Sequence, residues 1–81
     1  MKIKALNNKQ LKYLHKHSLQ SKYIKAAELF EKDYRHPSLN IEILEPKKLR
    51  LYSFRLDIKY RVIFIVVDGE AEVLSITNHY K

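Results

Sequence analysis

Hydrophobic side chains in the C-terminal half of the chain recur at the spacing of β-strands. The run from Tyr60 to Val67 is apolar on both faces apart from Arg61, which predicts a central strand buried front and back. The dipeptide Asp68-Gly69 that follows it supplies the positive φ angles of a two-residue type I′ turn. This turn predicts an antiparallel hairpin in which the opposing pairs are Val66 with Ala71 and Phe64 with Val73.

A second hairpin is predicted just before the first, with its turn near Asp57-Ile58-Lys59. We expect a three-residue loop with Leu56 opposite Tyr60; a shift of one residue would exchange the two faces of the strand. One face would then be apolar enough to pack under helices, and it holds Tyr52, Phe54, Leu56, Tyr60, Val62, Phe64, Val66, Ala71 and Val73. The opposite face, here called the open face, would mix basic and apolar side chains: Ser53, Arg55, Arg61, Ile63, Leu74 and Ile76. An isolated monomer would not expose such a face without a use for it.

Two amphipathic helices are predicted before the strands. Asn7 is a suitable N-cap for the first helix, with Gln10 at the capping-box position, and this helix should stop near His17. Ser18 is predicted to cap the second helix, which should end at His36-Pro37 because the residue before a proline is disfavoured in the α region. Apolar side chains recur at helical spacing along this second helix: Leu19, Tyr23, Ala26, Ala27, Phe30 and Tyr34.

Two further segments complete the predicted architecture. Residues 2–6 are predicted as a short edge strand, and residues 38–48 as an edge or a loop, because Pro46 cannot donate to a sheet ladder. Two helices followed by a twisted antiparallel sheet of three to four strands make an α+β fold. We expect residues 1–81 to form a single domain.

Composition excludes several classes of protein. The chain contains no Cys, so neither a disulfide nor a Cys metal site is expected, and its four His are scattered. The longest apolar run, Val62 to Val67, is far shorter than the roughly 20 residues that cross a bilayer. The N-terminus lacks the apolar centre of a signal peptide. We therefore expect a soluble cytoplasmic protein with no cofactor, no metal and no membrane partner.

The charge of the chain predicts an anionic partner. The formal net charge is +7, and residues 47–61 hold six basic side chains against the single acid Asp57. The basic residues of this segment are Lys47, Lys48, Arg50, Arg55, Lys59 and Arg61. The N-terminal lysines, by contrast, are typical of a solvated helix face.

One edge of the predicted sheet gathers polar groups that suit RNA cleavage by the RNA's own 2′-hydroxyl. Glu45 could take the 2′-OH proton, and His79 could protonate the departing 5′-oxygen. Arg61 and Arg55 present planar forks that match phosphate oxygens. Tyr80 could stack on a base or orient His79. The remaining basic residues of 47–61, which are Lys47, Lys48, Arg50 and Lys59, are candidates for binding RNA phosphate.

Simpler interpretations stand beside each of these roles. Arg55 and Arg61 could be ordinary strand residues paired with Asp57 or Glu72. Glu45 could be a loop carboxylate, and a terminal His-Tyr pair could be plain surface. Composition and spacing by themselves justify a small basic α+β protein with an anion-binding face.

From His36 onward the chain resembles the RelE/ParE superfamily of bacterial toxins. The stretches that carry the resemblance are HPSL, LEPKK, LYSFRLDIKYRVIF, the Asp-Gly turn and ITNHYK. The strand pattern with the final His79-Tyr80 is most similar to the YoeB-like branch, whose members also carry a Glu-Pro pair that matches Glu45-Pro46. The connection from Glu45 to the first long strand is short in this chain.

The resemblance implies a RelE-like fold and a toxin of a toxin–antitoxin pair. For the YoeB-like branch it implies a ribosome-dependent, metal-independent mRNA endonuclease, with functional residues at Glu45, Arg61, His79 and Tyr80. It also implies a cognate antitoxin that covers the toxin in a hetero-oligomer. The alternative is a ParE-like toxin that inhibits DNA gyrase without catalysis, and a third possibility is a non-catalytic binding protein of the same superfamily.

Overall fold

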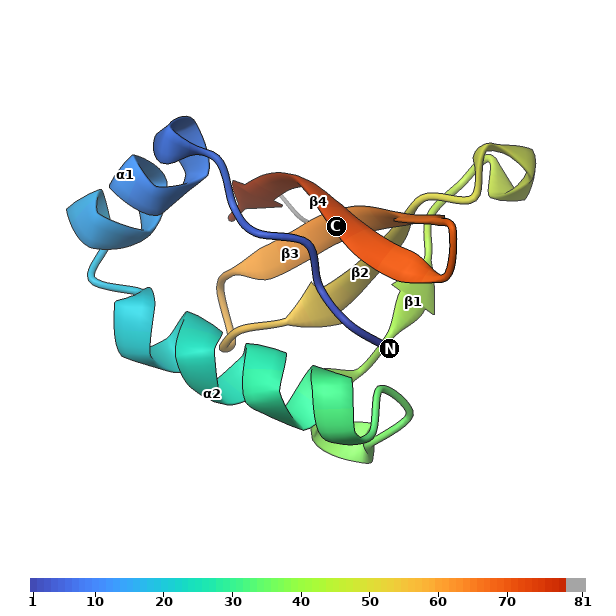
Figure 1. The fold of residues 1–81 in the computed structure, drawn as a ribbon, viewed down its shortest axis with the longest axis horizontal. Helices are drawn as coiled ribbons and strands as arrows, with labels where there is room; N and C mark the ends of the chain where they lie inside the picture. Colours follow the sequence, from blue (N-terminus) through green and yellow to red (C-terminus); the bar gives the residue numbers. More distant parts are fainter. Residues whose placement is uncertain (79–81) are drawn as a thin grey trace.

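The computed structural model describes residues 1–78 as two helices followed by an antiparallel sheet (Figure 1). The helices are α1 (Asn8–Lys16) and α2 (Gln20–Lys32), and the strands are β1 (Glu42–Ile43), β2 (Tyr52–Arg55), β3 (Arg61–Val67) and β4 (Glu70–Thr77). Short 3-10 turns, η1 (Pro37–Leu39) and η2 (Lys47–Leu49), precede β1 and β2. The strands of this part of the chain lie in the order β1-β2-β3-β4, which confirms the predicted α+β fold.

Helix α1 begins and ends where the sequence predicts. The side chain of Asn7 accepts a hydrogen bond from the Gln10 backbone N–H (2.8 Å), and the Gln10 side chain accepts one from the Asn7 N–H (3.1 Å). This reciprocal capping box satisfies two donors of the first turn. His17 is the C-cap residue.

The junction between the helices differs from the prediction, because Ser18 terminates α1 instead of capping α2. Ser18 has a left-handed φ of 56°, and its N–H donates to the carbonyl of His15. The N–H of Leu19 reaches back to the carbonyl of Leu14 (2.8 Å), which completes a Schellman motif. Leu14 and Leu19 are both buried, so packing in the core stabilises this turn. No side chain caps the N-terminus of α2.

Helix α2 also ends earlier than predicted. It stops at Lys32, and the side chain of Asp33 accepts a hydrogen bond from the N–H of Arg35 (3.2 Å). An Asp that bonds the backbone two residues on favours a turn over further helix. Pro37 therefore opens η1 instead of ending α2.

Both predicted hairpins are confirmed in type, and their register beside each turn is as predicted. Asp68 and Gly69 have φ angles of 53° and 79°, as a type I′ turn requires, and Val66 lies opposite Ala71. In the β2–β3 hairpin the N–H of Leu56 donates to the carbonyl of Tyr60 (2.9 Å), so the loop holds three residues.

A β-bulge in β4 changes one predicted face. Phe64 pairs with Val73 and Ile63 with Ser75, so Leu74 is the extra residue between them. Beyond the bulge the face of each side chain is reversed. Ile76, predicted on the open face, is 7% exposed in the core.

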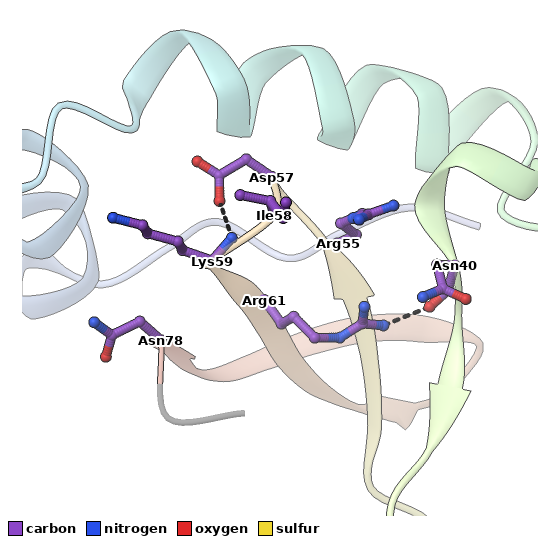
Figure 2. Close-up of a pocket in the computed structure, with 7 residues that line it drawn as sticks. All are labelled: Asn40, Arg55, Asp57, Ile58, Lys59, Arg61 and Asn78. Atoms are coloured by element: carbon purple, nitrogen blue, oxygen red, sulfur yellow. Dashed lines mark hydrogen bonds between the residues drawn. The ribbon is translucent and has the colours of Figure 1, made fainter. Parts of the chain in front are cut away.

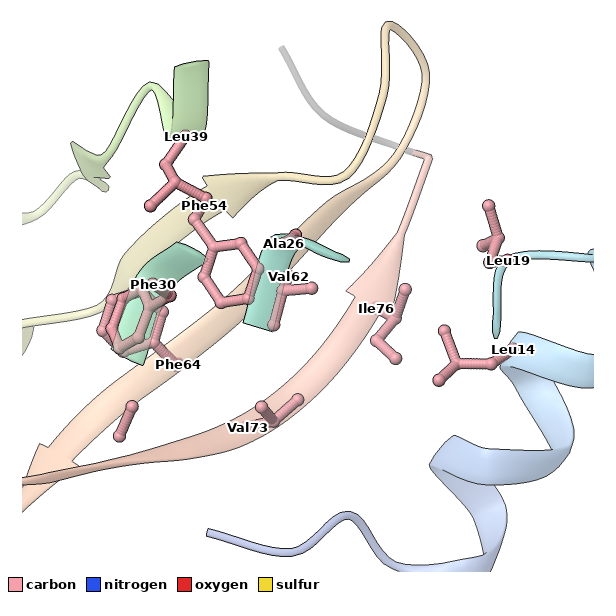
Figure 3. Packing of buried hydrophobic residues seen from close by; sticks show 11 residues of the cluster. Leu14, Leu19, Ala26, Phe30, Leu39, Phe54, Val62, Phe64, Val73 and Ile76 are labelled. Atoms are coloured by element: carbon pink, nitrogen blue, oxygen red, sulfur yellow. The ribbon is translucent and has the colours of Figure 1, made fainter. Parts of the chain in front are cut away.

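The core lies between the helices and one face of the sheet (Figure 3). Phe30 of α2 packs edge-on against Phe64 of β3, with ring centroids 5.3 Å apart, and also contacts the ring of Phe54.

Residues 2–4 run beside β4, where Lys4 donates to the carbonyl of Ala71, so the predicted edge strand is a single parallel bridge. Among residues 1–78, no helix has both the length and the apolar character that crossing a bilayer demands.

Candidate functional site

A basic pocket of about 460 Å³ lies where the β2–β3 hairpin meets the turn before β1 (Figure 2). Three of its side chains are cationic and one is acidic. The residues that line it are Asn40, Arg55, Asp57, Ile58, Lys59, Arg61 and Asn78.

Arg61 is the buried centre of this pocket. It is 5% exposed, and its Nε donates to the hydroxyl of Ser53 (2.9 Å). Its Nη2 donates to the carbonyl oxygens of Asn40 and Ser53. Burial lowers the pKa of Arg61, the charge of Glu42 raises it, and the charge of Arg55 lowers it. The side chain is therefore held in one orientation by fixed acceptors.

Arg55 lies directly opposite Arg61 in the sheet. Directly opposed residues of an antiparallel pair share a face, so both guanidinium groups belong to the open face. Arg55 and Lys59 are exposed, as is Ile58 at the tip of the hairpin. The structure thus brings Arg55 and Arg61 together, as predicted, and Lys59 lines the same pocket.

Asp57 holds the hairpin loop in shape. Its Oδ1 accepts the N–H groups of Lys59 and Tyr60, both at 2.8 Å, and its Oδ2 accepts from Nζ of Lys22 at 2.7 Å. Burial raises the pKa of Asp57, but the hydrogen bonds from Lys22 and the two N–H groups outweigh it and lower the pKa. The acid pairs with a helix lysine and so leaves the cationic character of the pocket in place.

The two carboxylates considered as partners for the pocket arginines form ion pairs with lysines instead. Asp57 pairs with Lys22, as described, and Glu72 pairs with Lys4 at 3.5 Å.

Glu45 does not line the pocket. The register pairs Ile43 with Tyr52 at one end of β2 and Arg55 with Arg61 at the other. Glu45 lies beyond Ile43, exposed, in the connection to η2. The structure does not bring Glu45 to the arginines as predicted. The chain leaves β1 at the Tyr52 end of β2, away from Arg55 and Arg61.

Lys47, Lys48 and Arg50 share the position of Glu45. They are exposed in and beside η2, at the Tyr52 end of the sheet. The basic segment 47–61 is thus divided between two ends of the sheet.

The other two predicted site residues, His79 and Tyr80, lie outside the described residues. The last paired residue of β4, Thr77, lies opposite Arg61, and Asn78 lines the pocket. Continued from Val66 opposite Ala71, the predicted register would place Ile76 opposite Arg61, and the bulge moves that pairing by one residue.

Three residues of the site were missed by the sequence interpretation. Ser53 and Asn40 supply the acceptors that hold Arg61, and Glu42 is the carboxylate whose charge acts on it. The alternation of Leu39, Ile41 and Ile43 was a usable signal, since it leaves Asn40 and Glu42 on the opposite side of an edge strand.

Within residues 1–78, no group of His, Asp and Glu side chains is arranged to hold a metal ion.

Comparison with solved structures identifies the fold. The chain superposes on a chain of the "YoeB-YefM complex from Staphylococcus aureus" with a TM-score of 0.64 and 18% identity, over 99% of this chain and 100% of that one. This chain has a YoeB-like fold. The RelE-like architecture that the resemblance implies is thereby confirmed, and at this identity the likeness shows the fold alone. No protein-family model matches the chain, and no curated protein matches it.

Proposed function

We propose that this protein is the toxin of a toxin–antitoxin pair and that it cleaves mRNA on the ribosome. The observation that carries the proposal is the cross-strand pair of Arg55 and Arg61, which lines one pocket together with Lys59. Planar guanidinium forks match the oxygens of a phosphate diester. Fixed cations at the position where negative charge grows are a large source of catalysis.

The proposed reaction is attack by the 2′-hydroxyl of the RNA on the adjacent phosphorus. A carboxylate takes the 2′-OH proton, the 2′-oxygen bonds to phosphorus, and the bond to the 5′-oxygen breaks. His79 gives its proton to that 5′-oxygen, and Tyr80 stacks on a base or orients His79. The products are a 2′,3′-cyclic phosphate and a 5′-hydroxyl. No metal takes part in these steps.

Two carboxylates compete for the role of base in this proposal. Glu45 matches the Glu-Pro pair of the YoeB-like branch. Glu42 lies on the same face as the arginines, as its pairing with Ser53 implies.

The basic residues at the other end of the sheet are proposed to bind the phosphate backbone of rRNA or mRNA. These are Lys47, Lys48 and Arg50, all exposed. Each phosphate that they neutralise would make binding more dependent on salt, with a slope of about −0.7 to −0.9. The ribosome as target places this activity in the cytoplasm.

The proposed partner is an antitoxin. The similar structure is named as a complex of YoeB with YefM. A chain with a net charge of +7 suits a partner segment rich in acidic side chains. We propose that such a segment neutralises the pocket in a hetero-oligomer.

The proposal is tested by inducing the chain alone in bacteria and mapping the 5′ ends of mRNA. We expect translation to stop and new 5′-hydroxyl ends to appear within coding regions. Intact mRNA accompanied by DNA breaks and filamentous cells would overturn the nuclease and support the gyrase-directed alternative. Normal growth with intact mRNA and DNA would contradict both.

A further inference from the structure

Glu42 lies on the open face of the sheet, one strand away from the guanidinium pair. It is paired directly with Ser53 of β2, so the two side chains point to the same face. The hydroxyl of Ser53 accepts the hydrogen bond from Nε of Arg61. Glu42 and Arg61 therefore flank the same buried serine.

Asn40 links the two charged groups. Its side-chain amide donates to Oε2 of Glu42 (3.4 Å), and its backbone carbonyl accepts from Nη2 of Arg61. Asn40 is in the left-handed conformation, with φ 46°, which Asn adopts more readily than most residues. The charged side chains that face Glu42 from the two nearest strands are Arg55 of β2 and Arg61 of β3.

The electrostatics agree with this placement. Burial and the charge of Arg55 lower the pKa of Arg61, and the negative charge of Glu42 opposes them. Glu42 is half-buried, so the residue keeps some exposure to solvent. Glu45, by contrast, is exposed at the other end of the sheet.

We infer that Glu42, rather than Glu45, is the general base of this site; the inference rests on the proposed function. A phosphate held between Arg55 and Arg61 on the open face would bring its ribose 2′-hydroxyl toward β1. The proton then passes from that hydroxyl to the carboxylate of Glu42, the 2′-oxygen bonds to phosphorus, the bond to the 5′-oxygen breaks, and that oxygen is protonated by the general acid of the proposed function. Glu42 is regenerated when it releases its proton to water.

The test compares Glu42→Gln, Glu42→Asp and Glu45→Gln on ribosomes programmed with a defined mRNA. Single-turnover cleavage is measured at about pH 7, because a carboxylate accepts a proton only when it is ionised. We expect Glu42→Gln to reduce the rate about 100-fold or more. Glu42→Asp, which keeps a carboxylate, should recover part of that rate, and Glu45→Gln should lose far less activity than Glu42→Gln.

Binding separates a catalytic from a structural role. An mRNA with a 2′-deoxyribose at the cleaved position cannot react, and Glu42→Gln should bind it with unchanged affinity. A Glu42→Gln rate within about threefold of wild type would overturn the inference, as would a Glu42→Asp rate as low as that of Glu42→Gln. The inference would also be overturned if Glu45→Gln, instead of Glu42→Gln, reduced the cleavage rate about 100-fold. A wild-type chain that cleaves no mRNA would instead refute the proposed function itself.

Discussion

Arg55 and Arg61 stand directly opposite each other across strands β2 and β3. Like charges at directly opposed positions destabilise a sheet, so this pair is a local cost to the fold. Natural sequences depart from local rules of stability mainly at functional sites. The pair is accommodated because Arg61 is fixed by Ser53 and Asn40, while Arg55 is exposed to water.

Removing one charge of the pair should stabilise the fold or leave it unchanged. Arg55→Ala is expected to raise the free energy of unfolding by about 0–1 kcal/mol, because the repulsion with Arg61 disappears and only an exposed side chain is lost. Urea denaturation measures this change. Lys48→Ala is the matched control, since it also removes one exposed positive charge. Destabilisation by more than about 1 kcal/mol would mean that Arg55 supports the fold.

The hydroxyl of Ser53 should contribute strongly to stability. Ser53→Ala removes the acceptor of Arg61 Nε at a fully buried position, so we expect a loss of about 1–3 kcal/mol. Ser21→Ala on the exposed surface of α2 is the control, with an expected effect below about 0.5 kcal/mol. Equal unfolding midpoints for the two variants would contradict this role.

The carboxylate of Asp57 should make stability depend on acid pH. Despite its partial burial, the hydrogen bonds from Lys22, Tyr60 and Lys59 place its folded-state pKa below the ordinary value of 3.8. Its stabilisation is therefore present above about pH 4 and is lost as pH falls through the lower folded-state pKa. Asp57→Asn should flatten the loss of stability below about pH 4, as followed by urea midpoints.

The control for that experiment is Asp68→Asn in the other hairpin turn. Asn adopts a positive φ readily and precedes Gly69, so the turn should persist. The wild-type slope should remain in Asp68→Asn because Asp57 is still present. The same slope in Asp57→Asn would show that its hydrogen bonds do not contribute.

The bulge at Leu74 predicts opposite sensitivities for two apolar neighbours. Ile76 is 7% exposed and Leu74 is 45% exposed. Ile76→Ala should cost about 2–5 kcal/mol because it leaves a cavity in the core, whereas Leu74→Ala should cost less than about 1 kcal/mol. The two substituted residues lie two positions apart in β4. Comparing the free energies of unfolding of the two variants by chemical denaturation therefore tests the strand register directly. A larger loss for Leu74→Ala would favour a sheet without the bulge.

The sequence was sufficient for those parts of the fold that depend on local chemistry. The Asp-Gly turn, the Asn7 capping box and the alternation in β2 and β3 each have a residue-level cause, and each was predicted correctly. The bulge was not predictable, because Leu74 is as apolar as a core residue and only packing decides which residue is extra. Ser18 was misinterpreted for a related reason, since a serine between two helices suits either an N-cap or a left-handed turn.

The site was predictable only in part. Arg55 and Arg61 were placed together because strand register follows from the turns. Glu45 was assigned by its Glu-Pro motif, and a motif says nothing of the direction in which the chain leaves an edge strand. Glu42 was passed over because its role comes from pairing with Ser53, which depends on the position of β1 in the finished sheet.

The most direct test of the pocket is the rate at which two charge-matched variants cleave ribosome-bound mRNA. Arg55→Ala removes a guanidinium from the pocket, and Lys48→Ala removes an equal charge from the far end of the sheet. At saturating ribosomes we predict a loss of about 10-fold or more for Arg55→Ala and less than about threefold for Lys48→Ala. Equal rates for the two variants would contradict the account that this pocket cleaves RNA.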